Sequence, residues 1–340
     1  MKALSVPMFA LAAASPLGFV VLACLWGGVW VWLALLWMAG AVVVLDLAVP
    51  LVAGAQDEAE FPGSDLLLVG LASGALLALP MLVWATAGPS GLGLGGRGAL
   101  FVAGGLWYGQ VAHPAAHELI HRSGRGMAWL GQAVYAALIF GHHASAHRLV
   151  HHRFVATGAD PNSARVGEGY YRFLGRAWLG SLRAGWRAER ALRRGTGISP
   201  YCAYGLGAGL ALALGYGLSG WTGVLVWAAL GFHFGAQVLL SDYVQHYGLE
   251  RRSTAGRLEP VAAGHSWNAP HLFSGALMLN APRHSDHHAH PSRPYPALRL
   301  GDDMPILPWP LPLACLVALC PPYWHWRMRP LVERAALAKA

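Results

Sequence analysis

Long runs of apolar residues divide the chain into segments that are each long enough to cross a lipid bilayer. A helix needs about 20 residues to span roughly 30 Å of hydrocarbon. The sequence contains six such runs, near 7–24, 28–49, 65–87, 97–117, 201–218 and 221–243. This pattern predicts an all-α integral membrane protein with about six transmembrane helices, formed as a single membrane-embedded domain over residues 1–340.

The first apolar run could also be a secretory signal peptide, because it is short and follows Lys2. A second run begins only a few residues later, however. Pro16 is followed by more apolar sequence rather than by a clear processing site. We therefore expect the first run to be retained as a span.

Two further segments have mixed character. Residues 168–197 alternate aromatic residues and leucine with arginine at roughly helical spacing. This predicts a helix lying at the membrane surface with its arginines near acidic headgroups, although a solvated basic helix fits the pattern almost as well. Residues 304–324 are apolar but interrupted by prolines, so we expect an interfacial segment rather than a span.

Composition and charge agree with a membrane location and indicate an orientation. Hydrophobic residues make up 55% of the chain and charged residues only 12%, about half the share of an ordinary soluble domain. The net charge of +8 comes mainly from two basic blocks, 118–200 and 244–340. Cytoplasmic loops are enriched in Lys and Arg, so both blocks, and with six spans both chain ends, are predicted to be cytoplasmic. No basic stripe with exposed aromatics supports nucleic-acid binding.

The four cysteines exclude several redox modules. They lie in apolar surroundings and contain no C-x-x-C pair: Cys24, Cys202, Cys315 and Cys320. Neither an iron–sulfur site nor a disulfide framework can be built from such a set. A reaction that needs electrons would therefore receive them from another protein.

Histidines carry the candidate chemistry. Of the 17 histidines, all but His325 fall between His113 and His290. They are concentrated in three clusters and one further motif, namely His117-Glu118-Leu119-Ile120-His121, His147-x-x-x-His151-His152, His284-Ser285-Asp286-His287-His288 and Gln245-His246-Tyr247-Gly248. Imidazole is a suitable ligand for iron, zinc and copper, and this many rings could hold two ions.

Helical spacing predicts which rings share an ion. Residues i and i+4 project from one face of an α-helix, so His117 and His121 are expected to reach one metal. The same argument pairs His147 with His151 and turns His152 about 100° away toward a second point. His284 is expected to share a face with His287 and His288. The clusters adjoin span ends at one membrane edge, where they could converge.

Other readings of these histidines remain open. His117-Glu118-x-x-His121 also matches the signature of zinc proteases, in which the glutamate is the general base. Such a site needs one metal and three protein ligands and would leave the other clusters without a role. A non-catalytic membrane metal-binding or transport protein is a third possibility, although transport favours ionisable groups at mid-span. For histidines outside the clusters we expect packing or supporting roles, above all for His113, His143 and His233.

At these residues the sequence resembles the membrane alkane 1-monooxygenases (alkane hydroxylases) of the wider fatty acid desaturase–hydroxylase superfamily. The resemblance covers about residues 100–300. It rests on HELIHR (117–122), HRLVHHRFVATGADPNSARVGE (147–168), DYVQHYGLER (242–251), HSWN (265–268) and PRHSDHHAHPSRPYPALR (282–299). The tyrosine–glycine element after His246, followed by HSWN, distinguishes this branch from general desaturases.

The resemblance implies a cytoplasmic-side di-iron site in the bacterial inner membrane, with the ligands His117, His121, His147, His151, His152, His246, His284, His287 and His288. It implies oxygen-dependent hydroxylation of medium-chain alkanes, or similar lipid-like chains, to primary alcohols. Electrons would come from rubredoxin and its NADH-dependent reductase. Desaturation or decarboxylation of fatty acyl chains by the same kind of centre is the alternative.

The chain departs from the family pattern beside the ligands. Ala146 and Val150 stand where the second box usually has glutamate and glycine, and Ala281-Pro282 replaces the common Leu-Gln. The metal ligands are unchanged, but neighbours of ligands tune metal affinity and reactivity.

Two further sets of residues have expected roles. Three carboxylates are expected to orient the imidazoles rather than to bridge metals: Glu118, Asp242 and Asp286, of which Asp286 could equally cap a helix. A substrate channel between the spans is expected to be lined by Trp37, Met38, Leu45 and Trp107, although apolar side chains in a span often simply face lipid.

Overall fold

The computed structural model describes residues 4–49, 51–52, 54, 60–194, 197–254 and 257–337. The two chain ends, which we expect on the cytoplasmic side, lie outside the described residues. The α-helices are α1 (Val6–Trp26), α2 (Val29–Leu36), α3 (Val42–Ala48), α4 (Ser64–Ala87), α5 (Leu94–Trp107), α6 (His113–His121), α7 (Arg125–Ala137), α8 (His142–Ala146), α9 (His152–Phe154), α10 (Tyr170–Leu192), α11 (Pro200–His246), α12 (Leu272–Leu277), α13 (His284–Ala289), α14 (Leu311–Ala318) and α15 (Pro321–Leu337).

Shorter elements connect these helices. Three are π-helical turns, η1 (Trp37–Ala41), η2 (Tyr108–Ala112) and η3 (His147–His151), and two are 3-10 turns, η4 (Ala263–His265) and η5 (Tyr295–Ala297). A small antiparallel hairpin joins β1 (Ser253–Thr254) to β2 (Arg257–Leu258). The protein is otherwise helical, as the apolar pattern predicts.

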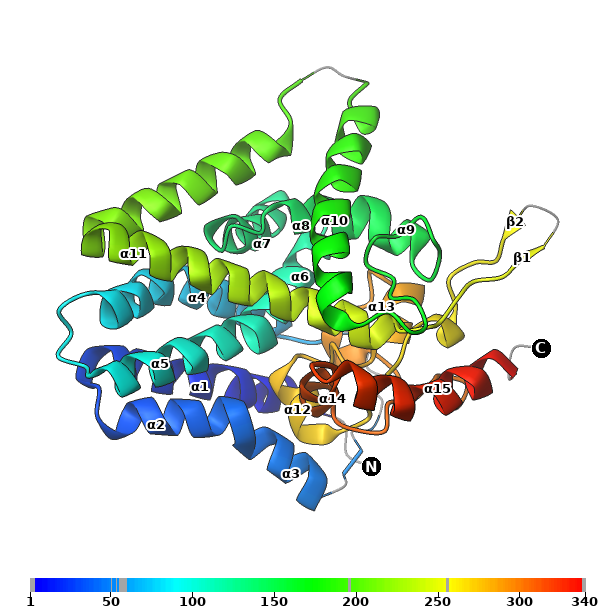
Figure 1. Cartoon of the computed structure of the whole chain (residues 1–340), viewed down its shortest axis with the longest axis horizontal. Helices are drawn as coiled ribbons and strands as arrows, with labels where there is room; N and C mark the ends of the chain where they lie inside the picture. Colours follow the sequence, from blue (N-terminus) through cyan, green and yellow to red (C-terminus); the bar gives the residue numbers. More distant parts are fainter. Residues whose placement is uncertain are drawn as a thin grey trace.

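Within the described residues, four helices are long and apolar enough to cross a membrane: α1, the run Val29–Ala48 through η1, α4 and α11. In Figure 1 these helices and α5 extend together toward one side of the molecule, and α1, α2, α4 and α5 pack against one another. The predicted span 97–117 lies inside a helical run from Leu94 to His121, which is not among the four. The protein is therefore a helical membrane protein, and the count of six spans stays a prediction.

The long helix α11 folds back on itself. Its backbone leaves helical geometry at Ser219 and Gly220, where Gly220 has φ 58° and ψ −148°, a conformation that only glycine adopts easily. The two arms on either side coincide with the predicted spans 201–218 and 221–243, and Figure 1 shows the turn between them. Close to this turn the backbones of Gly215 and Gly223 touch, because neither residue carries a side chain.

A buried carboxylate ties the N-terminal helices to the histidine-rich C-terminal part. Asp46 in α3 accepts hydrogen bonds from the backbone amides of Phe273, at 2.8 Å, and Ser274, at 3.0 Å. These amides lie in the first turn of α12, where the N–H groups have no partner within the helix. Asp46 thus caps the helix that precedes the third histidine cluster.

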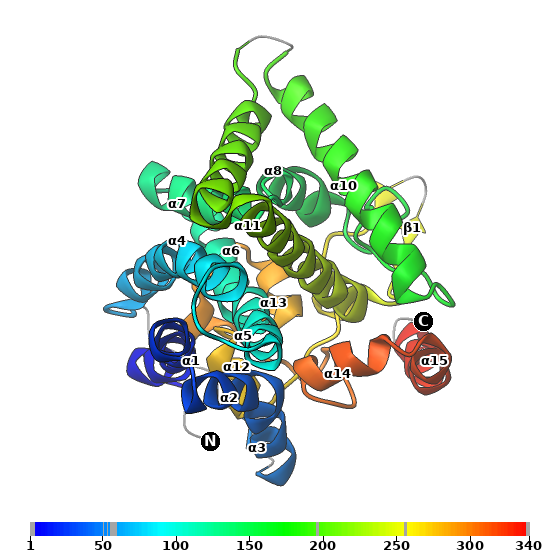
Figure 2. The ribbon, with the colours of Figure 1, turned by 60° about the vertical axis from the view of Figure 1, so that its left-hand side comes forward.

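The predicted helix over 168–197 is present as α10. One face is buried through Phe173, Ala177, Ser181 and Gly185, while most of its arginines are exposed. Figure 2 shows α10 and the first arm of α11 close together where α10 ends and α11 begins, and spreading apart from there. The segment 304–324 forms the short helix α14 and the start of α15, neither of which is among the candidate spans. The placement of both segments at a membrane surface stays a prediction.

The glycine contact at the turn of α11 leads to a test of the fold. A Cβ at Gly223 would overlap the carbonyl oxygen of Gly215, whereas a Cβ at Gly217 would meet nothing within 4 Å. We expect Gly223→Ala to destabilise the protein by about 1–3 kcal/mol through overpacking. Gly217→Ala is the matched control and should leave stability unchanged or slightly raised, because alanine favours helix. Thermal unfolding of the two variants in detergent measures the difference; equal melting temperatures would contradict the close approach of the two arms.

Candidate metal centre

Nine histidine rings from four separate stretches of the chain meet in two adjoining groups. The first group contains His117, His121, His147, His152 and His287, and the second contains His151, His246, His284 and His288. Within each group the ring nitrogens that face one another lie within 4.8 Å of one another. These are the nine rings expected from the sequence to act together.

The helix α6 supplies the first pair as its spacing predicts. His117 and His121 stand four residues apart on one face, and their ring centroids are 5.0 Å apart. In η2, directly before α6, the amide of His113 donates to the carbonyl of Tyr108, a hydrogen bond that spans five residues. This wide turn sets the rotation of α6 relative to α5, and with it the direction in which the two rings point.

The second cluster differs from the expectation. His147 does not share a group with His151; it shares the first group with His152. The cause is the π-turn η3, in which the amide of His152 donates to the carbonyl of His147. An i→i+5 bond places residue 152, rather than residue 151, above residue 147, and the extra residue turns His151 toward the second group. The expected pairing of His147 with His151 is therefore wrong.

The third cluster divides between the two groups as well. His284 and His288, four residues apart on α13, both belong to the second group, as helical spacing predicts. His287 instead faces the first group, with its Nε2 3.2 Å from the Nε2 of His152. His246, the last residue of α11, completes the second group.

The contacts between ring nitrogens fit cations better than hydrogen bonds. In the first group, the Nε2 of His147 lies 2.6 Å from that of His117 and 2.8 Å from that of His152. In the second group, the Nε2 of His284 lies 3.1 Å from those of His246 and His288. The Nε2 atoms of His121 and His151 are among the buried ring nitrogens that have no hydrogen-bond partner in the described structure, as are the Nδ1 atoms of His147, His152, His287 and His288. One cation in each group would bind the facing Nε2 atoms, including those of His121 and His151.

The rings are also held in the protonation state that a metal requires. Burial, and after it the neighbouring imidazoles, keeps the pKa well below the usual histidine range for His147, His152, His284, His287 and His288. A neutral ring keeps a lone pair on one nitrogen, so these side chains are ready to bind a cation without first losing a proton.

One carboxylate orients a ring of the second group. The Oδ2 of Asp160 accepts a hydrogen bond at 2.8 Å from the Nδ1 of His151, which leaves the Nε2 of that ring free for a metal. Asp160 is fixed in turn by Ser163 and by the backbone amide of Asn162. Burial by itself would raise the pKa of the Asp160 carboxyl, but the facing His151 and these hydrogen bonds hold that pKa below its usual range.

The three carboxylates expected to orient imidazoles have other partners in the described structure. Glu118 accepts from the backbone amide of Tyr295 at 3.2 Å and pairs with Arg122 at 3.5 Å. Asp242 accepts from the amide group of Asn162 at 2.7 Å. Asp286 is bound by Arg293, by the backbone amide of Arg299 and by His290, which belongs to neither ring group. None of the three hydrogen-bonds one of the nine rings, so the expected orienting role passes to Asp160.

Histidines outside the two groups have packing and supporting contacts, as expected for His113 and His143. The Nδ1 of His113 lies 2.9 Å from the hydroxyl of Tyr135. His143 stacks on Phe140, and its ring centroid is 5.1 Å from that of His147. His233 lies far along α11 and stacks on Phe101.

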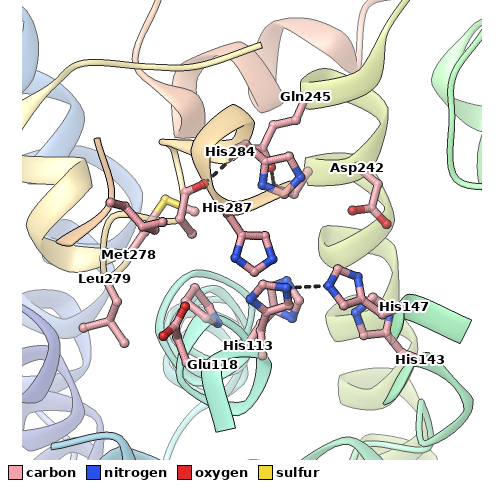
Figure 3. Close-up of a pocket in the computed structure, with 15 residues that line it drawn as sticks. His113, Glu118, His143, His147, Asp242, Gln245, Met278, Leu279, His284 and His287 are labelled. Carbon is pink, nitrogen blue, oxygen red and sulfur yellow. Dashed lines mark hydrogen bonds between the residues drawn. The ribbon is translucent and has the colours of Figure 1, made fainter. Parts of the chain in front are cut away.

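A small cavity of about 30 Å³ adjoins the rings. Figure 3 shows His147, His284 and His287 directed toward this space, with Glu118 and Asp242 also at its wall. Its apolar wall comes from Pro114, Met278, Leu279, Ala281 and Leu298. The volume holds one or two water-sized molecules. Leu279 and Asn280 have positive φ values of 52° and 55°, which sets the course of the chain beside this wall.

The residues expected to line a substrate channel do not reach this cavity. Trp107 is fully buried and donates to the carbonyl of Ala13 at 3.2 Å, and Met38 is buried as well. Trp37 is half-buried beside Phe19, with ring centroids 5.9 Å apart, and Leu45 is exposed. Their role as a channel stays a prediction.

Comparisons with known proteins point to one family. The sequence model of the fatty acid desaturase family matches residues 91–309, which include all nine rings. Alkane 1-monooxygenase 1 of Pseudomonas aeruginosa is 35% identical over 247 residues, which is 70% of this chain and 64% of the relative. Alkane 1-monooxygenase 2 of Alcanivorax borkumensis is 32% identical over 252 residues, 72% of this chain and 66% of the relative.

A further relative is matched over more of its length. Alkane 1-monooxygenase 2 of Pseudomonas aeruginosa is 32% identical over 322 residues, 89% of this chain and 84% of the relative. The chain thus spans slightly less than two thirds of the first two relatives and more than four fifths of the third.

The contact between Asp160 and His151 predicts the effect of removing one charge. Asp160→Asn should weaken metal binding at the second ring group by roughly 10- to 100-fold, because the ring loses the carboxylate that fixes its orientation and basicity. Titration of the metal-free protein with Co²⁺, followed by its absorption, measures the affinity at each site. Asp302→Asn, at an exposed position, is the control and should bind as the unmodified protein does. Equal affinities in both variants would show that Asp160 does not support a metal site.

Proposed function

The chain belongs to the fatty acid desaturase family, in the branch of the alkane 1-monooxygenases, and from this membership we propose that it hydroxylates the terminal carbon of medium-chain alkanes or similar lipid-like chains. The observation that carries the proposal is the division of nine imidazoles, seven of them buried, into two adjoining groups. Two groups fit two ions, whereas a zinc protease needs one ion and three ligands.

We assign the two groups as the ligands of two irons. The five rings around His147 would hold one ion, and the four rings around His284 would hold the other. When bound, the iron pair would activate dioxygen. With two electrons and two protons delivered to the site, one oxygen atom is inserted into the C–H bond and the other leaves as water. The imidazoles contribute by fixing the position of the ions in a site from which most water is excluded.

The small cavity gives the substrate end a place beside both groups. Its apolar wall, including Met278, Leu279 and Leu298, suits a terminal methyl group, while His147 and His284 face it from the two ring groups. A methyl group held there lies close to the reacting centre, which restricts oxidation to the chain end.

Two buried carboxylates at the same cavity are suited to proton delivery. Glu118 and Asp242 both line it, and neither hydrogen-bonds a ring of the two groups. In Asp242, the Oδ2 is held by Asn162, so we assign the other oxygen, Oδ1, as an atom that passes a proton into the cavity.

Electrons would come from a separate protein. The four cysteines form no C-x-x-C pair, so the chain has no iron–sulfur or rubredoxin-like module of its own. We propose rubredoxin, reduced by its NADH-dependent reductase, as the donor. The basic blocks 118–200 and 244–340 support a cytoplasmic location for the metal centre and both chain ends, in a bacterial inner membrane crossed by six spans.

The family name points to one competing reaction, because fatty acid desaturation uses a similar centre. Desaturation or decarboxylation of an acyl chain would produce an alkene where hydroxylation produces an alcohol. A membrane protein that only binds metal would turn over neither substrate.

Product analysis tests the proposed reaction. The iron-loaded protein, given rubredoxin, its reductase, NADH and dioxygen, should convert medium-chain alkanes to primary alcohols with one oxygen atom from ¹⁸O₂ in each product. His147→Ala should abolish turnover, while His325→Ala, a ring outside both groups, should retain it. Alkenes without ¹⁸O would favour desaturation, and absence of any product from iron-loaded protein would refute the oxidation of alkanes.

The proposed channel predicts a change in substrate length. Trp37→Ser removes a large ring from the half-buried face of the second apolar run, so longer alkanes should be accepted. Trp32→Ser is the matched control, because Trp32 is 56% exposed and belongs to the same helix run. Chromatography of the alcohols from a mixture of alkanes measures the range. If Trp37→Ser leaves that range unchanged, the channel does not pass this residue.

A further inference from the structure

A second and much larger cavity lies apart from the metal centre. It has a volume of about 900 Å³ and is lined by α7, by the end of α10 and by the beginning of α11. Figure 2 shows α10 and the first arm of α11 spreading apart with α8 between them and α7 beside the first arm, and the lining residues come from these helices. Nothing in the proposed oxidation uses this space.

The polar part of this cavity carries an excess of positive charge. Arg125, Arg148 and Arg193 line it, against one carboxylate, Glu189. That carboxylate is already engaged, since it accepts from the hydroxyl of Ser145 at 2.6 Å and forms an ion pair with Arg193. Arg125 and Arg148 are exposed, and no carboxylate in the described part of the chain pairs with either of them. Two guanidinium groups are thus available to an anion.

The rest of the cavity is apolar and follows a membrane-crossing helix. Ala203, Gly207 and Leu210 lie along the first arm of α11, and Ala136 and Ala137 face them from α7. The first arm of α11 is part of a candidate membrane span that begins at Pro200. The cavity therefore combines arginine side chains with an apolar wall that follows the first arm of a candidate span. Trp129, 69% exposed at the same cavity, is typical of a membrane interface.

We propose that this cavity binds an anionic phospholipid. The phosphodiester group would lie between Arg125 and Arg148, and an acyl chain would follow α11 past Ala203, Gly207 and Leu210. Guanidinium groups donate paired hydrogen bonds to phosphate oxygens, and apolar side chains replace the lipid neighbours of the acyl chain. A free phosphate would fill only a small part of the volume and would leave the apolar wall uncovered.

The proposed lipid would lie on the reverse side of α8, the helix that leads directly into η3 and its metal-centre rings. Ala144 and Ser145 of α8 line the large cavity, while His143 and His147 line the small one. A bound lipid would hold α8 and η3 in place, and because it binds the folded state it would raise the melting temperature. This site does not depend on the proposed oxidation, since lipid binding needs neither substrate nor electrons.

Native mass spectrometry of the delipidated, metal-loaded full chain tests the proposal. Phosphatidylglycerol should bind with one saturable site, and phosphatidylcholine should bind much more weakly. The double variant Arg125→Gln/Arg148→Gln should weaken phosphatidylglycerol binding about 30-fold, since each basic side chain near an anionic lipid contributes on the order of a tenfold or smaller factor. The control Arg183→Gln/Arg187→Gln removes two exposed arginines from α10 outside the cavity and should bind normally.

A second pair of variants tests the apolar part without changing charge. Ala203→Phe fills the cavity and should weaken lipid binding, whereas Cys202→Phe, at the exposed neighbouring position, should not. Metal content and melting temperature without lipid establish that each variant is folded. Phosphatidylcholine binding as tightly as phosphatidylglycerol, glycerol phosphate competing as strongly as the lipid, or equal losses in test and control variants would each overturn the proposal.

Discussion

The division of nine imidazoles into two groups depends on one wide turn of helix. In η3 the amide of His152 reaches back five residues to His147, and this places two consecutive histidines, His151 and His152, in different groups. In a regular α-helix His147 and His151 would face the same way, and the first group would lose His152. The π-turn is therefore what allows a single short segment, 147–152, to serve two ions.

The surrounding structure fixes these rings before any ion is bound. Burial keeps every ring except His151 neutral, Asp160 fixes the orientation of His151, and Asp46 caps the helix that leads toward the third cluster. Closely packed imidazoles are unfavourable without a cation when the nitrogens that face one another lack some of their hydrogen-bond partners. The same crowding makes the site suitable for metal, because the lone pairs already converge and little reorganisation is needed on binding.

Much of this arrangement follows from the sequence, and its exceptions have physical causes. Apolar runs place the helices, and the i, i+4 spacing places His117 with His121 and His284 with His288. The π-turn η3 could not be predicted from the sequence, because no residue type marks the extra residue of such a turn. Glu118 follows His117 directly, so on a helix it points about 100° away and meets Arg122 and Tyr295 instead of a ring. Asp160 reaches His151 through an irregular loop, and no periodic pattern describes such a contact.

The most direct test of this account is a structure of the iron-loaded protein with anomalous diffraction recorded at the iron edge. The account predicts two anomalous peaks per chain, one among His117, His121, His147, His152 and His287 and the other among His151, His246, His284 and His288. A single peak, or a peak bound by both His147 and His151, would contradict the division of the rings on which the proposed function rests.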